Sequence, residues 1–222
     1  MGDCIELVSP VPGKNTVVVH ADDARWEVAR AAVEELQLQV GCQLTPALLA
    51  DLQEAATRRE AAVRALRHLE RRPRTELEMR RRLSEDGYAS SIVQRVVRDL
   101  RGSGLLDDRK YADWYVEARL SHRPTGAAAL VRAMCDRGVP REVADAAAAR
   151  VATPEQEVSR ALAAARKRLP GLRGLTRERA IGRLSRFLGG RGFDDFVVRA
   201  VCCRILDHEF GCSTEVSDET EF

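Results

Sequence analysis

Arginine is the residue type whose spacing in this sequence could do chemistry, and that chemistry is the binding of anions. A planar guanidinium pairs with a phosphate or carboxylate through two parallel hydrogen bonds. The candidate contacts cluster in the middle of the chain: Arg71, Arg72, Arg74, Arg80, Arg81, Arg82, Arg109, Lys110, Arg119 and Arg123. A further stripe, Arg95, Arg98 and Arg101, has the i, i+3 spacing of one helix face. The alternative is a solvated, arginine-rich surface.

The distribution of charge favours a polyanionic or acidic partner. The 222-residue chain has a net charge of only +2. Residues 58–210 carry +12, however, whereas residues 1–57 carry −6 and residues 211–222 carry −4. A basic body of this kind is typical of proteins that meet phosphates or an acidic protein surface. Aromatic residues do not alternate with the arginines, so stacking on single-stranded bases is poorly supported.

No catalytic or metal-binding set is visible in the sequence. The histidines, at positions 20, 68, 122 and 208, are scattered, and there is no nucleophile elbow, Walker loop or H-E-x-x-H motif. Asp107 and Asp108 could suggest metal ligation. Their place directly before Arg109 is better explained by an N-cap and first-turn acid that oppose a helix dipole. We therefore expect a protein that is not an enzyme and that has no metal and no cofactor.

The cysteines also lack the spacing of metal ligands. They stand at positions 4, 42, 135, 202, 203 and 212 without C-x-x-C spacing. Cys135, Cys202 and Cys203 fall at apolar positions of expected helices, and we predict that they are buried free thiols.

The elements that must position the arginines are mainly helical. Two β-rich segments, 5–8 and 16–20, flank a Pro- and Gly-containing turn and predict a hairpin. A short helix is expected over 24–40 and is ended by Gly41. The pair Thr45-Pro46 then starts a helix that meets no breaker until Pro73.

An internal repeat follows this long helix. Its reference points are Gly87, Gly138 and Gly192, which are 51 and 54 residues apart. Apolar residues recur around each glycine at the same offsets, from eight residues before it to thirteen after it. The pattern predicts a helix that the glycine ends in the left-handed conformation, followed by a second amphipathic helix. Another helix precedes each pair, over 58–71, 108–121 and 154–169.

The predicted fold class is therefore mainly α, with three tandem three-helix units that form an elongated curved rod. The expected divisions are an N-terminal hairpin and helical extension over 1–57, three-helix repeats over 58–104, 105–153 and 154–210, and an acidic, disordered tail over 211–222. Within the third repeat, residues 170–176 are predicted to form a mobile loop.

The start of the second repeat resembles the signature region of the RecX family of recombination regulators. The resemblance covers residues 104–112, then Arg119, Gly126 and the pattern Leu130-x-x-x-Met134-x-x-x-Gly138-Val139. Residues 65–88 are similar to the first repeat of that family. The signature positions, which we interpret as structural, are Gly104, Leu106, Asp107, Asp108, Tyr111, Ala112, Gly126 and Gly138.

The resemblance implies a non-enzymatic regulator of homologous recombination and DNA repair in the SOS response. RecX proteins bind RecA, lie in the groove of the RecA–DNA filament, and restrain its ATPase, strand-exchange and co-protease activities. The expected partners are thus RecA and the RecA–DNA filament, with weak non-specific DNA binding, and the ten basic side chains become candidate contacts to RecA or DNA. The protein is expected to be a monomer.

Two other functions stay open at this point. One is an autonomous DNA-binding regulator built on helix-turn-helix-like units, which the turn over 87–91 and the arginine stripe allow. The other is a helical adaptor for a different protein partner. The N-terminus has no signal region and no apolar run approaches the ~18 residues of a membrane span, so we expect a cytoplasmic protein without a membrane partner.

Overall fold

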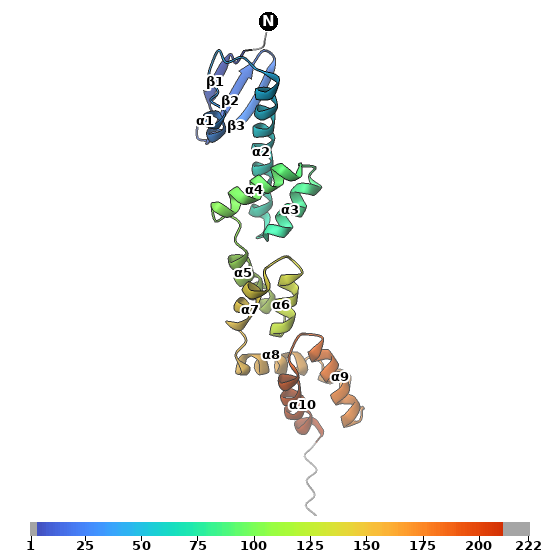
Figure 1. The fold of residues 1–222 in the computed structure, drawn as a ribbon. Helices are drawn as coiled ribbons and strands as arrows, with labels where there is room; N and C mark the ends of the chain where they lie inside the picture. Colours follow the sequence, from blue (N-terminus) through green and yellow to red (C-terminus); the bar gives the residue numbers. More distant parts are fainter. Residues whose placement is uncertain (1–3, 211–222) are drawn as a thin grey trace, which may run out of the picture. The chain divides into compact units, whose positions relative to one another are not determined.

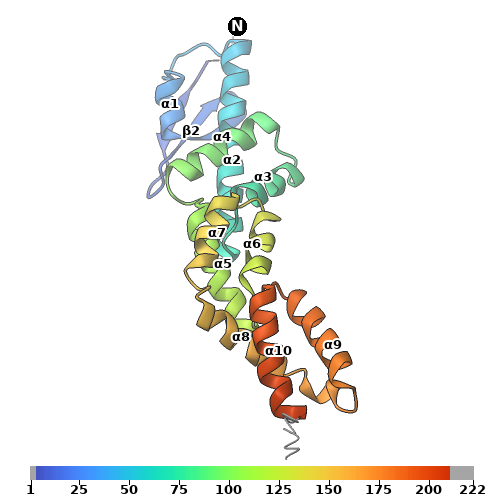
Figure 2. The ribbon, with the colours of Figure 1, turned by 60° about the horizontal axis from the view of Figure 1, so that its bottom comes forward.

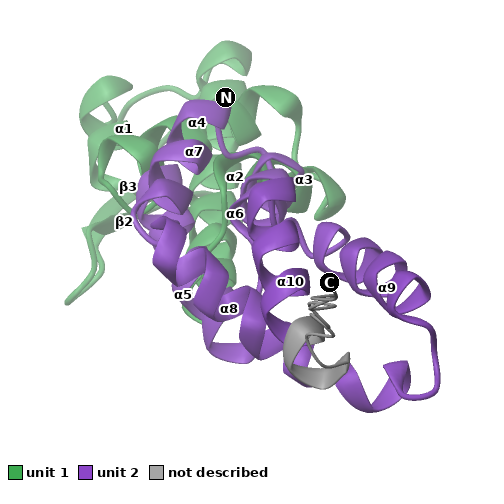
Figure 3. Cartoon of the chain, turned by 90° about the horizontal axis from the view of Figure 1, so that it is seen from below, with its two compact units in different colours: residues 1–107 green, residues 108–222 purple. Residues whose placement is uncertain are grey.

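The computed structural model describes residues 4–210, with side chains up to Ile205, as a mainly helical protein with a small N-terminal sheet (Figure 1). Packing divides the chain into two compact units, residues 1–107 and residues 108–222 (Figure 3). The predicted acidic tail over 211–222, with Cys212, lies outside the described residues.

The N-terminal sheet has three antiparallel strands in the order β1-β2-β3, namely Leu7–Pro10, Thr16–Ala21 and Ala24–Ala29. The predicted hairpin is confirmed as the β1–β2 pair. The predicted helix over 24–40 is wrong in its first part, since β3 occupies it and α1 covers only Arg30–Glu35. The chain reverses between β2 and β3 in two residues because Asp22 adopts a positive φ of 47°, which aspartate tolerates better than most residues.

Gly41 does not end a helix, contrary to the prediction. Helix α1 stops at Glu35, and Gly41 lies in the following connection with a φ of 87°. Its N–H donates to the Ile5 carbonyl over 2.8 Å, and the Ile5 N–H donates to the Cys42 carbonyl over 2.9 Å. The connection therefore holds the start of the chain, where Ile5 is buried in the core of the sheet.

Helix α2 extends over Pro46–Arg71, as predicted from the Thr45-Pro46 start, and it serves two cores (Figure 2). The Thr45 hydroxyl accepts a hydrogen bond from the Leu48 N–H over 3.2 Å, which satisfies one free donor of the first turn. In its first half, Leu52 is buried against the sheet. In its second half, Ala61 and Ala65 are buried against the next two helices.

Those two helices, α3 and α4, complete the first module; they cover Glu76–Glu85 and Ser90–Gly102. The Thr75 hydroxyl caps α3 by accepting from the Glu78 N–H over 3.0 Å. Gly87 ends the α3 segment with a φ of 92°, and the next residue, Tyr88, donates its N–H to the Leu83 carbonyl over 3.2 Å. The turn predicted from the repeat is confirmed here.

The second unit contains two more modules of three helices. The second module comprises α5, α6 and α7, over Asp108–His122, Ala127–Cys135 and Arg141–Ala149. The third comprises α8, α9 and α10, over Pro154–Arg166, Arg177–Gly189 and Asp195–Phe210. Gly138 and Gly192 have φ values of 90° and 81°, as the repeat predicts. The loop predicted to be mobile instead contains a 3-10 helix over Leu169–Leu172, and Leu172 is buried in the third core.

The two modules of the second unit meet through a backbone contact between Gly126 and the Gly192 turn. The Gly126 N–H donates to the Arg191 carbonyl over 2.9 Å. A Cβ on Gly126 would lie 2.2 Å from the Gly192 carbonyl oxygen, and a Cβ on Gly192 would lie 2.3 Å from the Ala129 nitrogen. Only glycine fits at either position, so the α5–α6 connection is held directly against the α9–α10 connection.

In the first unit, a histidine–carboxylate pair holds α3 against α2. Nε2 of His68, which is 6% exposed, lies 2.8 Å from Oδ2 of Asp86, and Arg64 Nε lies 3.4 Å from the same oxygen. The hydrogen bond from His68 lowers the pKa of the Asp86 carboxyl below its ordinary value, although partial burial opposes the shift. A carboxyl with a lowered pKa stabilises the fold above its ordinary pKa, and this stabilisation is lost as the pH falls through the lowered value.

Gly126→Ala should destabilise the second unit, because the new methyl group must displace the backbone of Gly192. Overpacking of this kind costs about 1–3 kcal/mol. Urea unfolding followed by Trp114 fluorescence, in a Trp26→Phe background, would report on this unit alone. The matched control is Gly182→Ala, since a Cβ on Gly182 in α9 meets nothing within 4 Å. An unchanged urea midpoint for Gly126→Ala would contradict the predicted contact.

Asp86→Asn should destabilise the first unit by about 1 kcal/mol near pH 7, because a charge-assisted hydrogen bond becomes a neutral one. The difference from the parent protein should shrink as the pH falls below ~4, where the Asp86 carboxylate is progressively protonated. Trp26 fluorescence in a Trp114→Phe background measures this unit. As control, Asp99→Asn changes an exposed carboxylate of α4. A difference that stays constant from pH 7 to pH 3 would refute the role of this pair.

Candidate functional site

Four arginines gather at the end of α2 and on α3, and we name Arg71, Arg72, Arg74 and Arg82 the first arginine cluster. Burial, followed by the charge of Arg72, lowers the pKa of the Arg74 guanidinium; Arg82 and Arg71 add to the shift and Glu78 opposes it. The other three side chains therefore lie close enough to Arg74 for their charges to repel its guanidinium group.

Carboxylates compensate much of the charge in the first arginine cluster. Arg72 Nη1 lies 3.0 Å from Glu78 Oε2, and Arg82 Nη1 lies 2.8 Å from Glu85 Oε2. Arg74 Nε donates to the carbonyl of His68 over 3.3 Å. The cluster thus presents cations and anions side by side rather than a purely basic surface.

A second group of arginines lies in the other unit, where the α5–α6 and α9–α10 connections touch. It comprises Arg119 in the last turn of α5, Arg123 directly after α5, and Arg191 beside Gly192; we name these three the second arginine cluster. Burial lowers the pKa of the Arg191 guanidinium, and the charges of Arg123 and Arg119 lower it further. Within the described part of the chain, none of the three forms an ion pair with a carboxylate. The positive charge here is uncompensated.

Arg191 is not among the candidate contacts predicted from the sequence, in which only its neighbour Gly192 is interpreted, as the end of a helix. Its Nη1 donates to the Pro124 carbonyl over 3.2 Å, and its guanidinium carbon lies 4.5 Å from the centroid of the Phe187 ring. The repeat contains a signal that could have identified Arg191: Arg137 directly precedes Gly138, just as Arg191 directly precedes Gly192. Arg137 also lies over an aromatic ring, that of Tyr115, at 5.0 Å.

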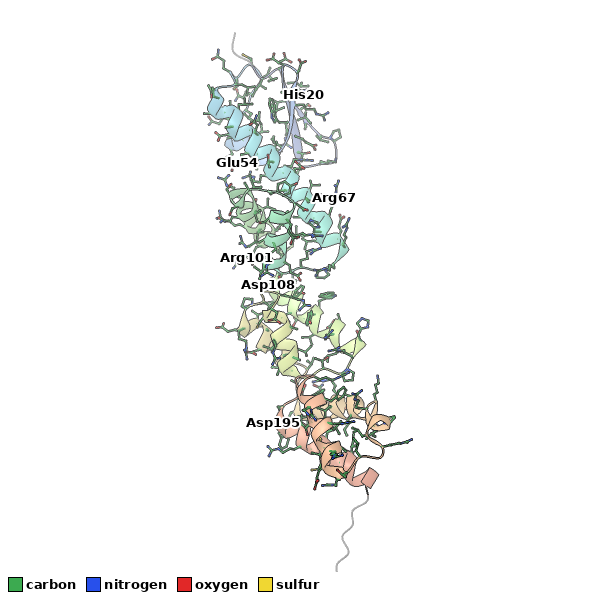
Figure 4. The ribbon with its side chains drawn as sticks, turned by 90° about the vertical axis from the view of Figure 1, so that its right-hand side faces the viewer. His20, Glu54, Arg67, Arg101, Asp108 and Asp195 are labelled. Atoms are coloured by element: carbon green, nitrogen blue, oxygen red, sulfur yellow. The ribbon has the colours of Figure 1, made fainter. Side chains whose placement is uncertain are left out.

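The remaining candidates are distributed over both units. On α3, Arg80 is half-buried and Arg81 is exposed, while Arg109 and Lys110 are exposed in the first turn of α5. The arginine stripe of α4 is partly neutralised by ion pairs at the surface: Arg95 lies 3.6 Å from Glu54, and Arg101 lies 3.4 Å from Glu76. Figure 4 labels Arg101 and Glu54 among the side chains of this unit.

The family-signature residues lie in cores and turns. Leu106 is buried in the core of the first module, and Tyr111 and Ala112 are buried in the core of the second. Gly104 has a φ of 71°, and Asp108 stands in the first turn of α5, directly after Asp107. The structural role of the signature stays a prediction, which the burial of Leu106, Tyr111 and Ala112 supports.

The cysteines are not all buried, contrary to the prediction. Cys202 is buried and burial raises the pKa of its thiol, Cys135 is half-buried, and Cys203 is exposed. Cys203 follows Cys202 in α10, and a step of one residue turns a side chain by about 100° around the helix axis. A buried neighbour therefore makes exposure of Cys203 the natural outcome.

Over the described residues, no group of three or more His, Cys, Asp or Glu side chains could hold a metal ion. In the same part of the chain, no helix combines the length and the apolarity that crossing a membrane requires.

Comparison with known proteins connects this geometry with a family. Residues 61–100 match a family model described as the first three-helix domain of RecX. Regulatory protein RecX of Prosthecochloris aestuarii is 29% identical over 148 residues, which cover 67% of this chain and 95% of that protein. Regulatory protein RecX of Streptomyces coelicolor is 27% identical over 161 residues, which cover 72% of this chain and 85% of that protein.

Solved structures share the fold. A crystal structure of regulatory protein RecX matches with a TM-score of 0.80 and 23% identity, over 90% of this chain and 98% of the other. The crystal structure of RecX from Lactobacillus salivarius matches with a TM-score of 0.62 and 18% identity, over 68% and 97%. The chain thus contains a segment that matches the first three-helix domain of RecX, and over two thirds of its length it is similar to proteins named regulatory protein RecX.

Proposed function

We propose that this protein is a non-enzymatic, cytoplasmic regulator of homologous recombination and DNA repair that binds RecA. As a monomer it would engage the groove of the RecA–DNA filament and restrain the ATPase, strand-exchange and co-protease activities of RecA. The observation that carries the proposal is similarity to RecX proteins: residues 61–100 match the first three-helix domain of RecX, and the aligned relatives are named regulatory proteins. The resemblance described above links that family with RecA.

The modular construction supports a filament as the target. Three modules with the same turn, at Gly87, Gly138 and Gly192, each enclose a core of their own. A filament offers many copies of one surface, and contacts by several linked modules strengthen one another through their high effective concentration. Each unit also carries an arginine cluster that can meet acidic groups of the filament.

An autonomous helix-turn-helix regulator receives less support. That function would use the arginine stripe of α4 to follow phosphates. Two of its three members, Arg95 and Arg101, are already engaged by Glu54 and Glu76, which leaves Arg98 as the member without a described ion pair. A single cation is a weak basis for reading a DNA groove.

Addition of the protein should slow the ATP hydrolysis that RecA performs on single-stranded DNA, at less than one copy per RecA. Substoichiometric inhibition is expected because one bound copy would affect a filament that contains many RecA protomers. The measurement is the steady-state rate of ATP hydrolysis as the protein is titrated. If the rate stays unchanged at every ratio, the proposed function is wrong.

The double variant Arg71→Gln, Arg81→Gln should weaken this inhibition roughly fivefold, the effect of losing about 1 kcal/mol of ion-pair energy. Both side chains are exposed and form no described ion pair, so the fold should not depend on them. Arg25→Gln, Arg30→Gln removes the same charge from exposed positions near the sheet and serves as the control. Equal inhibition by both double variants would exclude the α2–α3 region from the contact.

A further inference from the structure

We infer that the second arginine cluster, Arg119, Arg123 and Arg191, is a site for the phosphate groups of a DNA backbone. The inference rests on the proposed function because the proposed target, the RecA–DNA filament, contains DNA. It goes further in assigning direct contact with DNA to one junction between modules, whereas the proposed function requires only contact with RecA.

The charge of this site is unbalanced within the protein. Burial and the nearby guanidinium groups of Arg123 and Arg119 lower the pKa of Arg191, and no described carboxylate forms an ion pair with any of the three arginines. The N-terminus of α6, at Gly126, has no acid in its first turn and adds positive potential beside Arg123. The C-terminal ends of α5 and α9 offset part of the repulsion. The remaining repulsion among the arginines destabilises the fold locally, and bound anions would relieve it.

The site is held in place before any ligand arrives. Arg191 is fixed by the Pro124 carbonyl at 3.2 Å and by the Phe187 ring at 4.5 Å. Arg168 lies over the same ring at 5.5 Å and adds a fourth cation near it. The Gly126–Gly192 contact fixes the two connections that carry Arg123 and Arg191. A preorganised group of donors loses little conformational entropy when it binds.

The chemistry favours phosphate over an acidic protein surface. A DNA backbone is a row of anions with no cations between them, and an uncompensated arginine group matches it. All three members are arginines, whose planar fork fits phosphate oxygens in pairs. In the first arginine cluster, by contrast, Glu78 and Glu85 stand between the cations. Mixed charge of that kind suits a protein surface, which also carries both signs.

The test measures DNA binding by the full chain without RecA. Fluorescence anisotropy with an oligo(dT) of about 20 nucleotides, and with a duplex of about 20 base pairs, is recorded over a series of salt concentrations. Arg123→Gln is the main variant, because Arg123 is exposed and its side chain makes no described hydrogen bond or ion pair. Arg191→Lys keeps the positive charge but removes the planar guanidinium group that can donate two parallel hydrogen bonds. Arg132→Gln is the control, since this exposed arginine lines a groove between α6 and α7 instead.

Arg123→Gln should weaken binding roughly fivefold at low salt and reduce the slope of log affinity against log salt by about 0.7 for oligo(dT) or about 0.9 for duplex. The oligonucleotide with the larger change identifies the strand form that the site contacts. Arg191→Lys should weaken binding while the slope stays near that of the wild type, because the charge is retained. Arg132→Gln should match the wild type in affinity.

The inference is overturned if Arg123→Gln and Arg191→Lys bind both DNAs as the wild type does. It is also overturned if these variants lose affinity for RecA in the absence of DNA, which would make the cluster a site for an acidic protein surface. Parallel ATPase titrations keep the two ideas apart. Wild-type protein that binds DNA through the cluster but never slows RecA would contradict the proposed function and leave the phosphate site standing.

Discussion

Each module depends on one constraint, a left-handed residue that ends its second helix and turns the chain into the third. Gly87, Gly138 and Gly192 all have φ between 81° and 92°, a region where a Cβ is penalised and glycine is not. The apolar residue that follows each glycine folds back over the preceding turn, as Tyr88 does on Leu83. The two helices can then bury their apolar faces together, and the rest of each core assembles on that pair.

Much of the fold could be predicted because it is local and repeated. The helix start at Thr45-Pro46 and the turns of the repeat are each determined by residues a few positions apart in the sequence. Both predictions are confirmed. The third strand was missed because the apolar residues between Ala24 and Val40 also approximate a helix face. What decides for β3 is its pairing with β2 after the Asp22 turn, and register with another strand is not a local property.

At the candidate site too, local sequence features could be predicted and tertiary contacts could not. Clusters of arginines along the sequence pointed to anion binding, yet sequence position does not say which cations already have partners. Arg72, directly after α2, is engaged by Glu78 of α3, and Arg82 is engaged by Glu85 of the same helix. Arg119 and Arg123 meet Arg191 from more than 60 residues away in the chain. The second arginine cluster depends on tertiary contacts and could not be found by clustering alone.

The continuity of helix α2 restricts the insertions that this part of the chain can accept. Leu52 and Ala55 face the core of the sheet, and Ala61 and Ala65 face the core of the first module, all on one uninterrupted helix. Insertion of a single residue between positions 55 and 61 would rotate one set of side chains against the other by about 100°. An insertion of seven residues, about two turns, would restore the phase to within about 20°. The segment that joins the two cores therefore tolerates only changes of length that come close to a whole number of helical turns.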